Sequence, residues 1–388
     1  MHVAFFAAAC SFVFVFSAAG TPIPLYNTYR AEDGITNAHL GIVSVGYFVA
    51  AVTSLLVFGR LSNHLGRRPI ALAALTSAAL ACLVLIGMNG VLPLFTARVL
   101  QGLSCGLASS GLGSYVVDSA QGRPSWLPAA ITGSAPMVGI PIGALTCGAL
   151  VEYGPAPRVL VYAIMTAVLV LCAVLIAMSP ETMARSRGAL ASFRPRLQVP
   201  AGSTRLVLAA GAASVATWSL GGFYQAFGPS VVADHLGTTN PLVSAAVFAS
   251  VMVLNPLGAP LAGRLLPATA LRAGMAGFVL ALVGIMASLY AGATVPFIAA
   301  SLVVGVAQGA ASTGGLRALL AHAQQEERAG LLSTIYLVAY SGAAIPVMIA
   351  GGLTNTFDLS EIALGYAVLG LLASIVAVLA ARNPAKLR

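Results

Sequence analysis

Twelve long apolar runs limit what this chain can fold into. Each run has about 20 residues, the length that a helix needs to cross the hydrocarbon core of a bilayer. Of the 388 residues, 59% are hydrophobic and only 7% are charged, whereas a soluble domain carries about 25% charged residues. The runs are continuous and do not alternate, which favours helices over a membrane β-barrel. The predicted spans are 3–25, 39–58, 70–89, 92–117, 128–150, 158–178, 206–227, 242–262, 272–291, 295–318, 330–352 and 361–381. The sequence therefore predicts an all-α integral membrane protein.

The first run and the cysteines fit the same interpretation. Residues 1–20 lack a positively charged start and are followed by eleven more runs, so we expect a first span and not a cleaved signal peptide. All cysteines fall inside predicted spans, without the spacing of metal ligands or of an external disulfide set; they are Cys10, Cys82, Cys105, Cys147 and Cys172. We interpret them as small packing residues.

The positive charges predict the orientation. If the loop with Arg67 and Arg68 is cytoplasmic, strict alternation places only Arg30 and Arg158 outside, and Arg98 falls within a span. The cytoplasmic cations are then Arg60, Arg67, Arg68, Arg123, Arg185, Arg187, Arg194, Arg196, Arg205, Arg264, Arg272, Arg317, Arg328, Arg382, Lys386 and Arg388. This asymmetry follows the positive-inside rule and predicts two cytoplasmic termini. The net charge of +9 is thus a feature of topology and does not indicate a nucleic-acid partner.

The longest polar segment divides the chain into two halves of six spans. We predict bundles at residues 1–178 and 205–388, joined by a basic cytoplasmic linker, 179–204, whose arginines we expect at the anionic membrane surface. Short patterns recur in the second half at offsets of 204–207: Gly59-Arg60-Leu61 and Gly263-Arg264-Leu265, Gln101-Gly102 and Gln308-Gly309, Pro141 and Pro346, and Gly148 and Gly352. Each half has an even number of spans, so the repeat is parallel and its axis runs along the membrane normal.

Three motifs carry a family resemblance. They are the loop Gly59–Pro69, the pattern Leu94-x3-Arg98-x2-Gln101-Gly102 and the pattern Gly139-x3-Gly143-x4-Gly148. The whole chain resembles the major facilitator superfamily, in which such patterns lie between helices 2 and 3, in helix 4 and in helix 5. Asn63 and His64 stand where that family usually has Asp and Arg, and Ala144 and Cys147 replace a proline and a glycine of the helix-5 antiporter motif. The resemblance implies two six-helix bundles and points to the drug or metabolite efflux branches.

The basic loop is the first candidate site. Gly59 is expected to permit close helix approach and Gly66 a turn with positive φ, while Asp118 is a plausible acid for Arg67 or Arg68. The resemblance implies a conformational lock between the two halves, formed by Gly59, Asn63, Gly66, Arg67, Arg68 and Asp118. Asn63 cannot supply a full negative charge, which predicts a weaker lock. A simple topology anchor is the alternative.

Arg98 and Gln101 are the second candidate site. A cation inside a span is costly and usually functional, so Arg98 is expected to bind an anionic substrate group or to take part in proton coupling. The alternative is a structural arginine that pairs with helix carbonyls or extends to the outer face. No Asp or Glu falls in the middle of a span, and a proton-coupled carrier needs a titrating group reachable from both sides.

Two further sets of residues concern motion and substrate. Small residues allow close packing and proline bends a helix, so we expect Gly139, Pro141, Gly143 and Gly148 to shape a mobile helix. In the resembled family, certain spans line a central cavity, and aromatic and amide side chains in the corresponding spans are the substrate candidates. They are Tyr47, Trp218, Tyr224, Gln225, Gln308, Tyr336 and Tyr340. We expect about half of them to face the cavity. The alternative is that several of the aromatic residues in this set belong to an interfacial belt.

These features predict a secondary active transporter of a small organic solute, working by alternating access as a proton-coupled efflux antiporter. An uncoupled facilitator, a proton symporter for uptake and a membrane channel are the alternatives. We find no clustered nucleophile or metal-ligand residues and no nucleotide-binding loop, so we expect no enzyme, cofactor or metal. Short tails and eighteen arginines to one lysine suggest the inner membrane of a bacterium. We expect a monomer whose partners are its substrate and the lipid bilayer.

Overall fold

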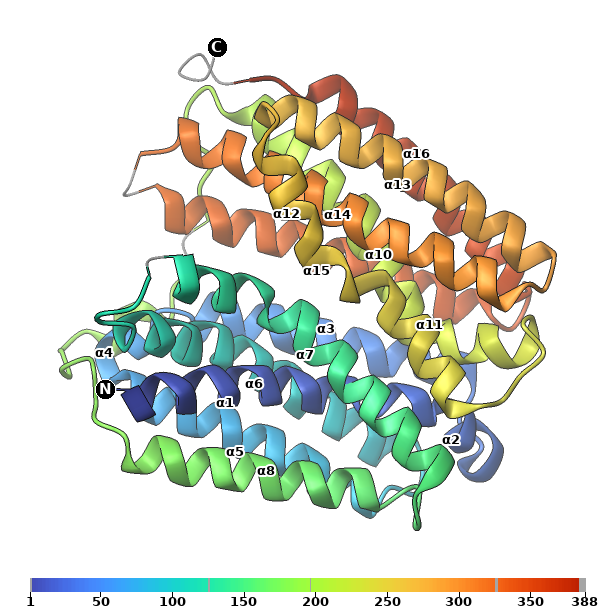
Figure 1. Ribbon diagram of the computed structural model, residues 1–388, viewed down its shortest axis with the longest axis horizontal. Coiled ribbons are helices and arrows are strands. Elements are labelled where there is room, and N and C mark those ends of the chain that lie inside the picture. Colours follow the sequence, from blue (N-terminus) through green and yellow to red (C-terminus); the bar gives the residue numbers. More distant parts are fainter. Residues whose placement is uncertain (1, 125, 196, 325–326, 384–388) are drawn as a thin grey trace. The chain divides into compact units, whose positions relative to one another are not determined.

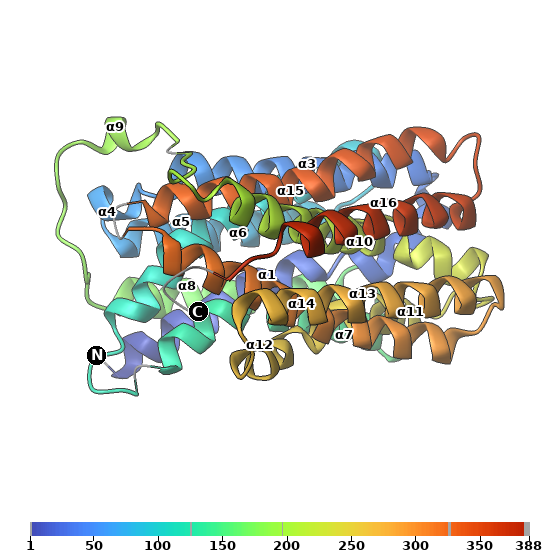
Figure 2. The same cartoon turned by 90° about the horizontal axis from the view of Figure 1, so that it is seen from above.

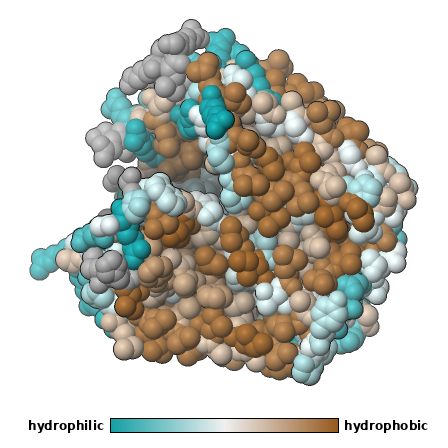
Figure 3. Space-filling view, viewed as in Figure 1, coloured by the Kyte–Doolittle hydropathy of each residue, from teal (hydrophilic) through white to brown (hydrophobic). Residues whose placement is uncertain are grey.

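The computed structural model describes residues 2–124, 126–195, 197–324 and 327–383, and every regular element within these ranges is a helix. Twelve candidate membrane spans lie in this described part of the chain, and their positions agree with the twelve predicted runs. Hydrophobic residues cover most of the face seen in Figure 3, and hydrophilic ones lie toward its edges. The all-α, multi-pass membrane fold is thereby confirmed. Three of the predicted cytoplasmic cations, Arg196, Lys386 and Arg388, lie outside the described residues.

The chain forms two compact units, drawn mainly blue to green and yellow to red in Figure 1. Unit 1 comprises Met1–Ile35 and Gly46–Pro195, and unit 2 comprises Thr36–Val45 and Arg196–Arg388. The crossing after Pro195 falls within the segment predicted as a linker. Residues Thr36–Val45 group with unit 2, where the Ser230 hydroxyl donates to Asn37 Oδ1 at 2.7 Å. The predicted boundaries at 178 and 205 stay a prediction.

In unit 1, α1 packs against α6, α7 and α8, and α5 packs against α6 and α8 (Figure 1). The short α9 lies in the loop after α8 (Figure 2), and the ring of Phe193, directly after it, packs against Phe58 at the end of α3. The elements are α1 (His2–Gly20), η1 (Ile23–Leu25), α2 (Tyr26–Asp33), α3 (Asn37–Phe58, shared with unit 2), α4 (Ser62–Leu65), α5 (Arg67–Ile86), α6 (Val91–Asp118), α7 (Trp126–Tyr153), α8 (Leu160–Met178) and α9 (Ala189–Ser192).

In unit 2, α14 packs against α11, α12 and α13, while α10 packs against both α15 and α16. Helices α15 and α16 touch each other little. The elements are α10 (Thr204–Asp234), α11 (Pro241–Val253), α12 (Asn255–Gly263), α13 (Pro267–Tyr290), α14 (Thr294–His322), α15 (Arg328–Leu353) and α16 (Leu359–Ala380).

Two spans that the sequence predicts as single runs are broken by proline. The run 3–25 ends as α1 at Gly20, because Pro22 has no amide hydrogen for the Ala18 carbonyl, and it continues as η1 and α2. The run 242–262 is divided between α11 and α12 at Leu254, two residues before Pro256. The interruption there is a single residue, and Pro241–Gly263 still forms one candidate span.

Each unit has a close glycine contact between two of its own helices, at the positions where the sequence repeats. A Cβ on Gly102 of α6 would lie 3.0 Å from the Ala51 amide of α3, and one on Gly309 of α14 would lie 3.2 Å from the Gly258 Cα of α12. Small residues at these points let the helices approach closely. The recurring Gln-Gly pair thus marks the same packing contact in each half.

Arg158 is the centre of an ion cluster that joins three segments of unit 1. Arg158 pairs with Glu32 Oε2 and Asp33 Oδ2, each at 2.6 Å, and donates to the Met88 carbonyl at 3.0 Å. Burial opposes the charge of Arg158, but the hydrogen bonds and charges of the two carboxylates outweigh it and raise the Arg158 pKa above its usual value. The cluster holds α2 against the loops that precede α6 and α8.

Candidate functional site

The loop between α3 and α5 contains the first candidate site, and its two glycines have different roles. Gly66 has φ 100° and ψ 159°, a backbone conformation that favours glycine, so the predicted positive φ is confirmed. A Cβ there would also lie 2.9 Å from the Glu181 carboxyl carbon. The expectation for Gly59 was wrong: its nearest neighbour is the Leu55 carbonyl of α3 itself. Gly59 therefore permits the turn that ends α3 and not the approach of another helix.

Arg67 is the centre of a polar network inside unit 1. Its Nε pairs with Asp118 Oδ2 at 2.9 Å, and its NH1 donates to Ser62 Oγ at 2.8 Å and to Asn63 Oδ1 at 2.6 Å. The Arg67 side chain is 8% exposed and the Asp118 side chain 27% exposed, so the guanidinium end of the network is largely shielded from water. Asp118, the acid expected for Arg67 or Arg68, pairs with Arg67, and the network joins the end of α6 to the start of α5.

Glu181 completes this site and was not among the predicted residues. Its Oε1 accepts the Arg67 amide at 2.8 Å and its Oε2 accepts the Arg68 amide at 3.1 Å. The first four amides of a helix have no partner within the helix and carry a partial positive charge, so a carboxylate at the N-terminus of α5 is well placed. Glu181 is the only acid in 179–204, which is the sequence signal that could have identified it.

The segment after α8 continues across the same loop. The Tyr115 hydroxyl donates to the Pro180 carbonyl, and the Thr182 hydroxyl donates to Asp118 Oδ2 at 3.3 Å. Farther along, Arg60 donates to the carbonyls of Ser192 and Arg194 at 3.2 and 3.1 Å. The first part of the predicted linker is therefore bound to the loop and to α6. The sequence predicted only that the arginines of this segment lie at the membrane surface, so these contacts are new.

Arg98 and Gln101 lie together in the interior of unit 1, where they cap the broken end of α1. Arg98 NH1 donates to the Ala19 carbonyl at 2.7 Å and to Gln101 Oε1 at 2.8 Å, and Gln101 Nε2 donates to the Ala18 carbonyl at 2.8 Å. Ala18 is the residue whose carbonyl Pro22 leaves without an amide partner. The structural alternative from the sequence, an arginine that pairs with helix carbonyls, describes this part of the geometry.

Part of the Arg98 guanidinium makes no hydrogen bond within the described residues. Arg98 is 0% exposed, and its Nε and NH2 have no hydrogen-bond partner among the described residues. Its Cζ lies 4.3 Å from the centroid of the Tyr47 ring, a cation–π contact. Tyr47 in turn donates to Cys105 Sγ at 3.6 Å. The site is thus a buried guanidinium beside an aromatic face, with two nitrogens that find no acceptor in the described part of the chain, an arrangement suited to binding an anionic or polarised group.

The glycines of α7 bring that helix against α1. A Cβ on Gly139 would lie 2.6 Å from the Val13 carbonyl oxygen, and one on Gly143 would lie 2.6 Å from the Ser17 carbonyl carbon. Pro141 lies between them within α7, and Gly148 is also buried. The spacing of the helix-5 motif therefore matches a close α1–α7 contact within unit 1.

The substrate candidates fall into buried and partly exposed groups. Tyr47, Tyr224, Gln225 and Gln308 are buried, and the Tyr224 hydroxyl shares a hydrogen bond with Ser301. Trp218 and Tyr340 are partly exposed, with ring centroids 4.8 Å apart, and Tyr336 is 43% exposed. The structure thus brings Tyr47 to Arg98 and Trp218 to Tyr340. Their predicted contact with substrate stays a prediction.

No group of three His, Cys, Asp or Glu residues in the described part of the chain is arranged to hold a metal ion. The family model of the Major Facilitator Superfamily matches residues 5–266. A crystal structure of the nucleoside transporter NupG, in a mutant form, is similar with a TM-score of 0.74 and 12% sequence identity, covering 98% of this chain and 100% of that one. No curated protein matches the sequence significantly.

Proposed function

This chain belongs to the Major Facilitator Superfamily, and we propose that it is a secondary carrier that moves a small organic solute by alternating access. The observation that carries the proposal is the buried Arg98, which keeps two nitrogens without partners among the described residues. Its Cα lies about 10 Å along α6 from Val91, the first residue of the helix. A fixed charge at such depth is costly, and in membrane proteins it marks substrate or ion pathways.

The substrate class follows from the chain's own side chains, because a likeness at 12% identity concerns the fold. Trp218 and Tyr340 present a pair of aromatic faces, and Gln225 Nε2 is buried without a partner in the described part of the chain. Aromatic walls with a few polar groups that fix orientation are typical of small-molecule sites. We propose an amphiphilic or apolar solute with a polar edge.

The finer proposal is efflux driven by proton antiport. The glycine pattern of α7 and its resemblance to the antiporter motif support it, and the partial loss of that motif at Ala144 and Cys147 weighs against it. The alternatives are an uncoupled facilitator or an uptake symporter, because the acids among the described residues lie in loops or in the first or last turns of helices. Asp118, for example, is the last residue of α6.

We further propose a bacterial inner-membrane protein with both termini cytoplasmic. Arg60, Arg67 and Arg68 lie at the α3–α5 loop, and Arg123 contacts Phe5 and Phe6 near the N-terminus. Such clustering of arginine in short loops is characteristic of the cytoplasmic side. The carrier is proposed to work as a monomer, without enzymatic activity, cofactor or metal.

Transport by purified protein in proteoliposomes tests the proposal. A panel of dyes and metabolites is offered with and without an imposed proton gradient, and we expect saturable, gradient-driven accumulation of one class of solute together with counterflow. Saturable flux that ignores the gradient would assign a facilitator. Flux without saturation or counterflow would overturn the carrier proposal and favour a channel.

A further inference from the structure

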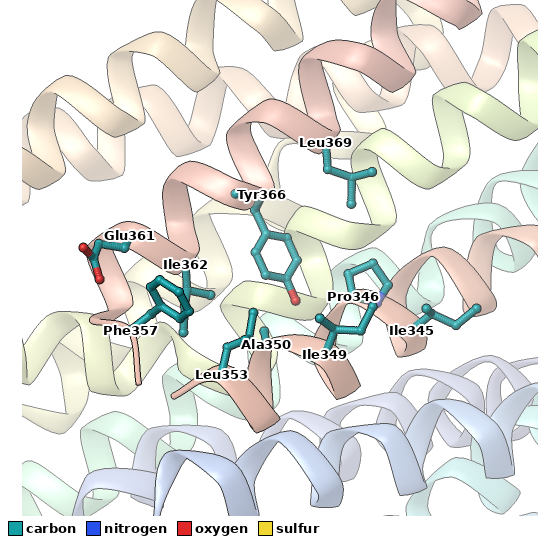
Figure 4. A pocket seen from close by; sticks show the side chains of 11 residues that line it. Ile345, Pro346, Ile349, Ala350, Leu353, Phe357, Glu361, Ile362, Tyr366 and Leu369 are labelled. Carbon is teal, nitrogen blue, oxygen red and sulfur yellow. The ribbon is translucent and has the colours of Figure 1, made fainter. Parts of the chain in front are cut away.

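An apolar groove lies on unit 2, where α15 and α16 diverge from the short connection that joins them. It encloses about 490 Å³, and Figure 4 shows its side chains between the two helices. Ile345, Ile349 and Phe357 line it and are 53%, 57% and 47% exposed. Exposed apolar side chains on a membrane-spanning helix are compatible with a hydrocarbon environment. The walls of the groove are therefore suited to an acyl chain.

Tyr366 introduces a polar group into this apolar wall. It extends from α16 toward α15 (Figure 4), is only 6% exposed, and its hydroxyl has no hydrogen-bond partner among the described residues. A buried hydroxyl without a partner is unfavourable. A small rotation of the ring into the groove would let the hydroxyl donate to an acceptor brought by a ligand, which would remove this penalty.

Glu361 gives one end of the groove a negative charge. It lies beside Phe357 at the end nearest the α15–α16 connection (Figure 4). Its Oε2 accepts the Asp358 amide at 2.9 Å in a capping box, and no described cation pairs with its carboxylate. The residues that line the groove include no lysine or arginine. This end therefore favours a cationic group and offers nothing to a net anionic one.

We propose that the groove is a binding site for one membrane glycerophospholipid with a primary-amine headgroup, of the phosphatidylethanolamine type. The ammonium group pairs with Glu361, an ester carbonyl accepts the Tyr366 hydroxyl, and an acyl chain lies along Ile345 and Ile349. The groove belongs to unit 2 and Arg98 to unit 1, and the proposal does not depend on the transported solute.

The spacing of the two polar groups fits such a lipid. Tyr366 follows Glu361 by five positions, which is about 7.5 Å of rise along α16. Each interfacial layer of a bilayer is about 5–7 Å thick, the difference between its total and hydrocarbon thickness shared between two sides. Glu361, in the first turn of α16, therefore lies at headgroup level when Tyr366 is at the level of the ester carbonyls. A free amphiphile without this spacing would satisfy only one of the two groups.

Native mass spectrometry of the full-length protein tests the site directly. Protein is titrated with phosphatidylethanolamine, phosphatidylcholine or phosphatidylglycerol carrying the same chains, and one bound lipid is expected, with the ethanolamine lipid retained about fivefold better than the choline lipid. Tyr366→Phe keeps the ring and removes the donor, so affinity should fall about tenfold. Glu361→Gln keeps the capping acceptor and should remove only the headgroup preference.

A matched pair of glycine variants separates occupancy of the groove from general effects. Gly365 lines the groove, and no described atom lies within 4 Å of where its Cβ would be. Gly365→Leu should fill the groove and abolish lipid retention while the protein remains folded. Gly352 of α15 is equally open but does not line the groove, so Gly352→Leu should retain the lipid.

Three results would overturn the proposal. The first is equal lipid retention by Gly365→Leu and Gly352→Leu. The second is preference for phosphatidylglycerol over the amine lipid. The third is a lipid-free dimer that Gly365→Leu dissociates, which would assign the groove to a second copy of the chain.

Discussion

The Glu181 carboxylate lies on the first turn of α5, where its Oε1 accepts the Arg67 amide at 2.8 Å. The resembled family usually has an acid at the position of Asn63, within the loop itself. In this chain the negative charges near Arg67 come instead from Glu181, beyond α8, and from Asp118, at the end of α6. The loop is therefore held by residues distant in sequence.

Loss of Glu181 should release this segment from the loop. Glu181→Ala leaves two helix amides without their acceptor, and loss of a helix cap costs about 1 kcal/mol. We expect trypsin to cleave after Arg185 and Arg187 several-fold faster, because the segment then keeps only the bonds of Ser186 to His64 and Asn63 next to these sites. Glu327→Ala is the matched control, since it removes an acid that accepts the Gln324 amide in unit 2. Equal cleavage of both variants would contradict the role of Glu181.

Restoring an acid at Asn63 should strengthen the loop. Asn63 Oδ1 already accepts from Arg67 NH1 at 2.6 Å, so Asn63→Asp converts a neutral hydrogen bond into an ion pair. Because Asn63 is exposed, the gain is at most about 1 kcal/mol. If the loop acts as a conformational lock, the labelling of cysteines introduced at the two membrane faces should change in opposite directions. Unchanged labelling at both faces would indicate a topology anchor instead.

Arg98 should be separable into a structural and a functional part. Arg98→Lys keeps the charge and one donor for the Ala19 carbonyl, so we expect insertion and most of the thermal stability to persist while gradient-driven transport is lost. Arg98→Ala should in addition lower the free energy of unfolding by about 2 kcal/mol, since a buried carbonyl loses its donor.

Thr21→Val is the control for Arg98. It removes another bond to the broken end of α1, from the Thr21 hydroxyl to the Ala18 carbonyl at 2.8 Å, without changing a charge. Its transport should continue at lowered stability. Normal coupled flux in Arg98→Lys and Arg98→Ala would reduce Arg98 to a helix cap.

Acid stability should depend on the Asp358 side chain at the start of α16. The Ser360 hydroxyl donates to Asp358 Oδ2 at 2.8 Å, and this bond, together with the nearby His235, holds the Asp358 pKa below its usual value despite partial desolvation. A group with a lowered folded-state pKa stabilises the fold above its unfolded pKa of about 3.9 and loses that contribution as pH falls through the folded value. Ser360→Ala should therefore reduce the fall in melting temperature below about pH 4. An unchanged pH profile would contradict this assignment.

The sequence predicted most of the fold because bilayer crossing constrains it so strongly. Length and hydropathy locate the twelve runs, since every span must satisfy its own backbone. The breaks at Pro22 and Pro256 were harder, because a proline can bend a helix or end it. At Pro22 the helix can end because Arg98 and Gln101 of α6 donate hydrogen bonds to the free carbonyls at the end of α1. Partners so distant in sequence leave no signal in the residues around Pro22.

The sequence predicted those parts of the candidate site that depend on a single turn or on the ends of neighbouring helices. Gly66 needed a positive φ within its own turn, and Asp118 was an acid at the adjacent helix end. Glu181 was missed because its partners are backbone amides 113 and 114 residues away, which have no side-chain signature. The role of Gly59 was predicted wrongly, because the sequence does not show whether a glycine contacts a neighbouring helix or the backbone of the helix that it ends.

The contact between α1 and α7 allows a sharp test of the helix-5 pattern. A Cβ on Gly143 would overlap the Ser17 backbone, with its carbonyl carbon 2.6 Å away, and backbone cannot move aside as a side chain can. Gly143→Ala should therefore lower the free energy of unfolding by about 1–3 kcal/mol, the usual cost of overpacking. Gly133, ten residues earlier in α7, has no described atom within 4 Å of its Cβ position, so Gly133→Ala should stabilise the helix by up to about 1 kcal/mol. Thermal unfolding of the two variants in the same detergent measures both signs. Similar shifts for both would show that α7 moves away from α1 without cost, and the glycine spacing would then have to serve motion and not packing.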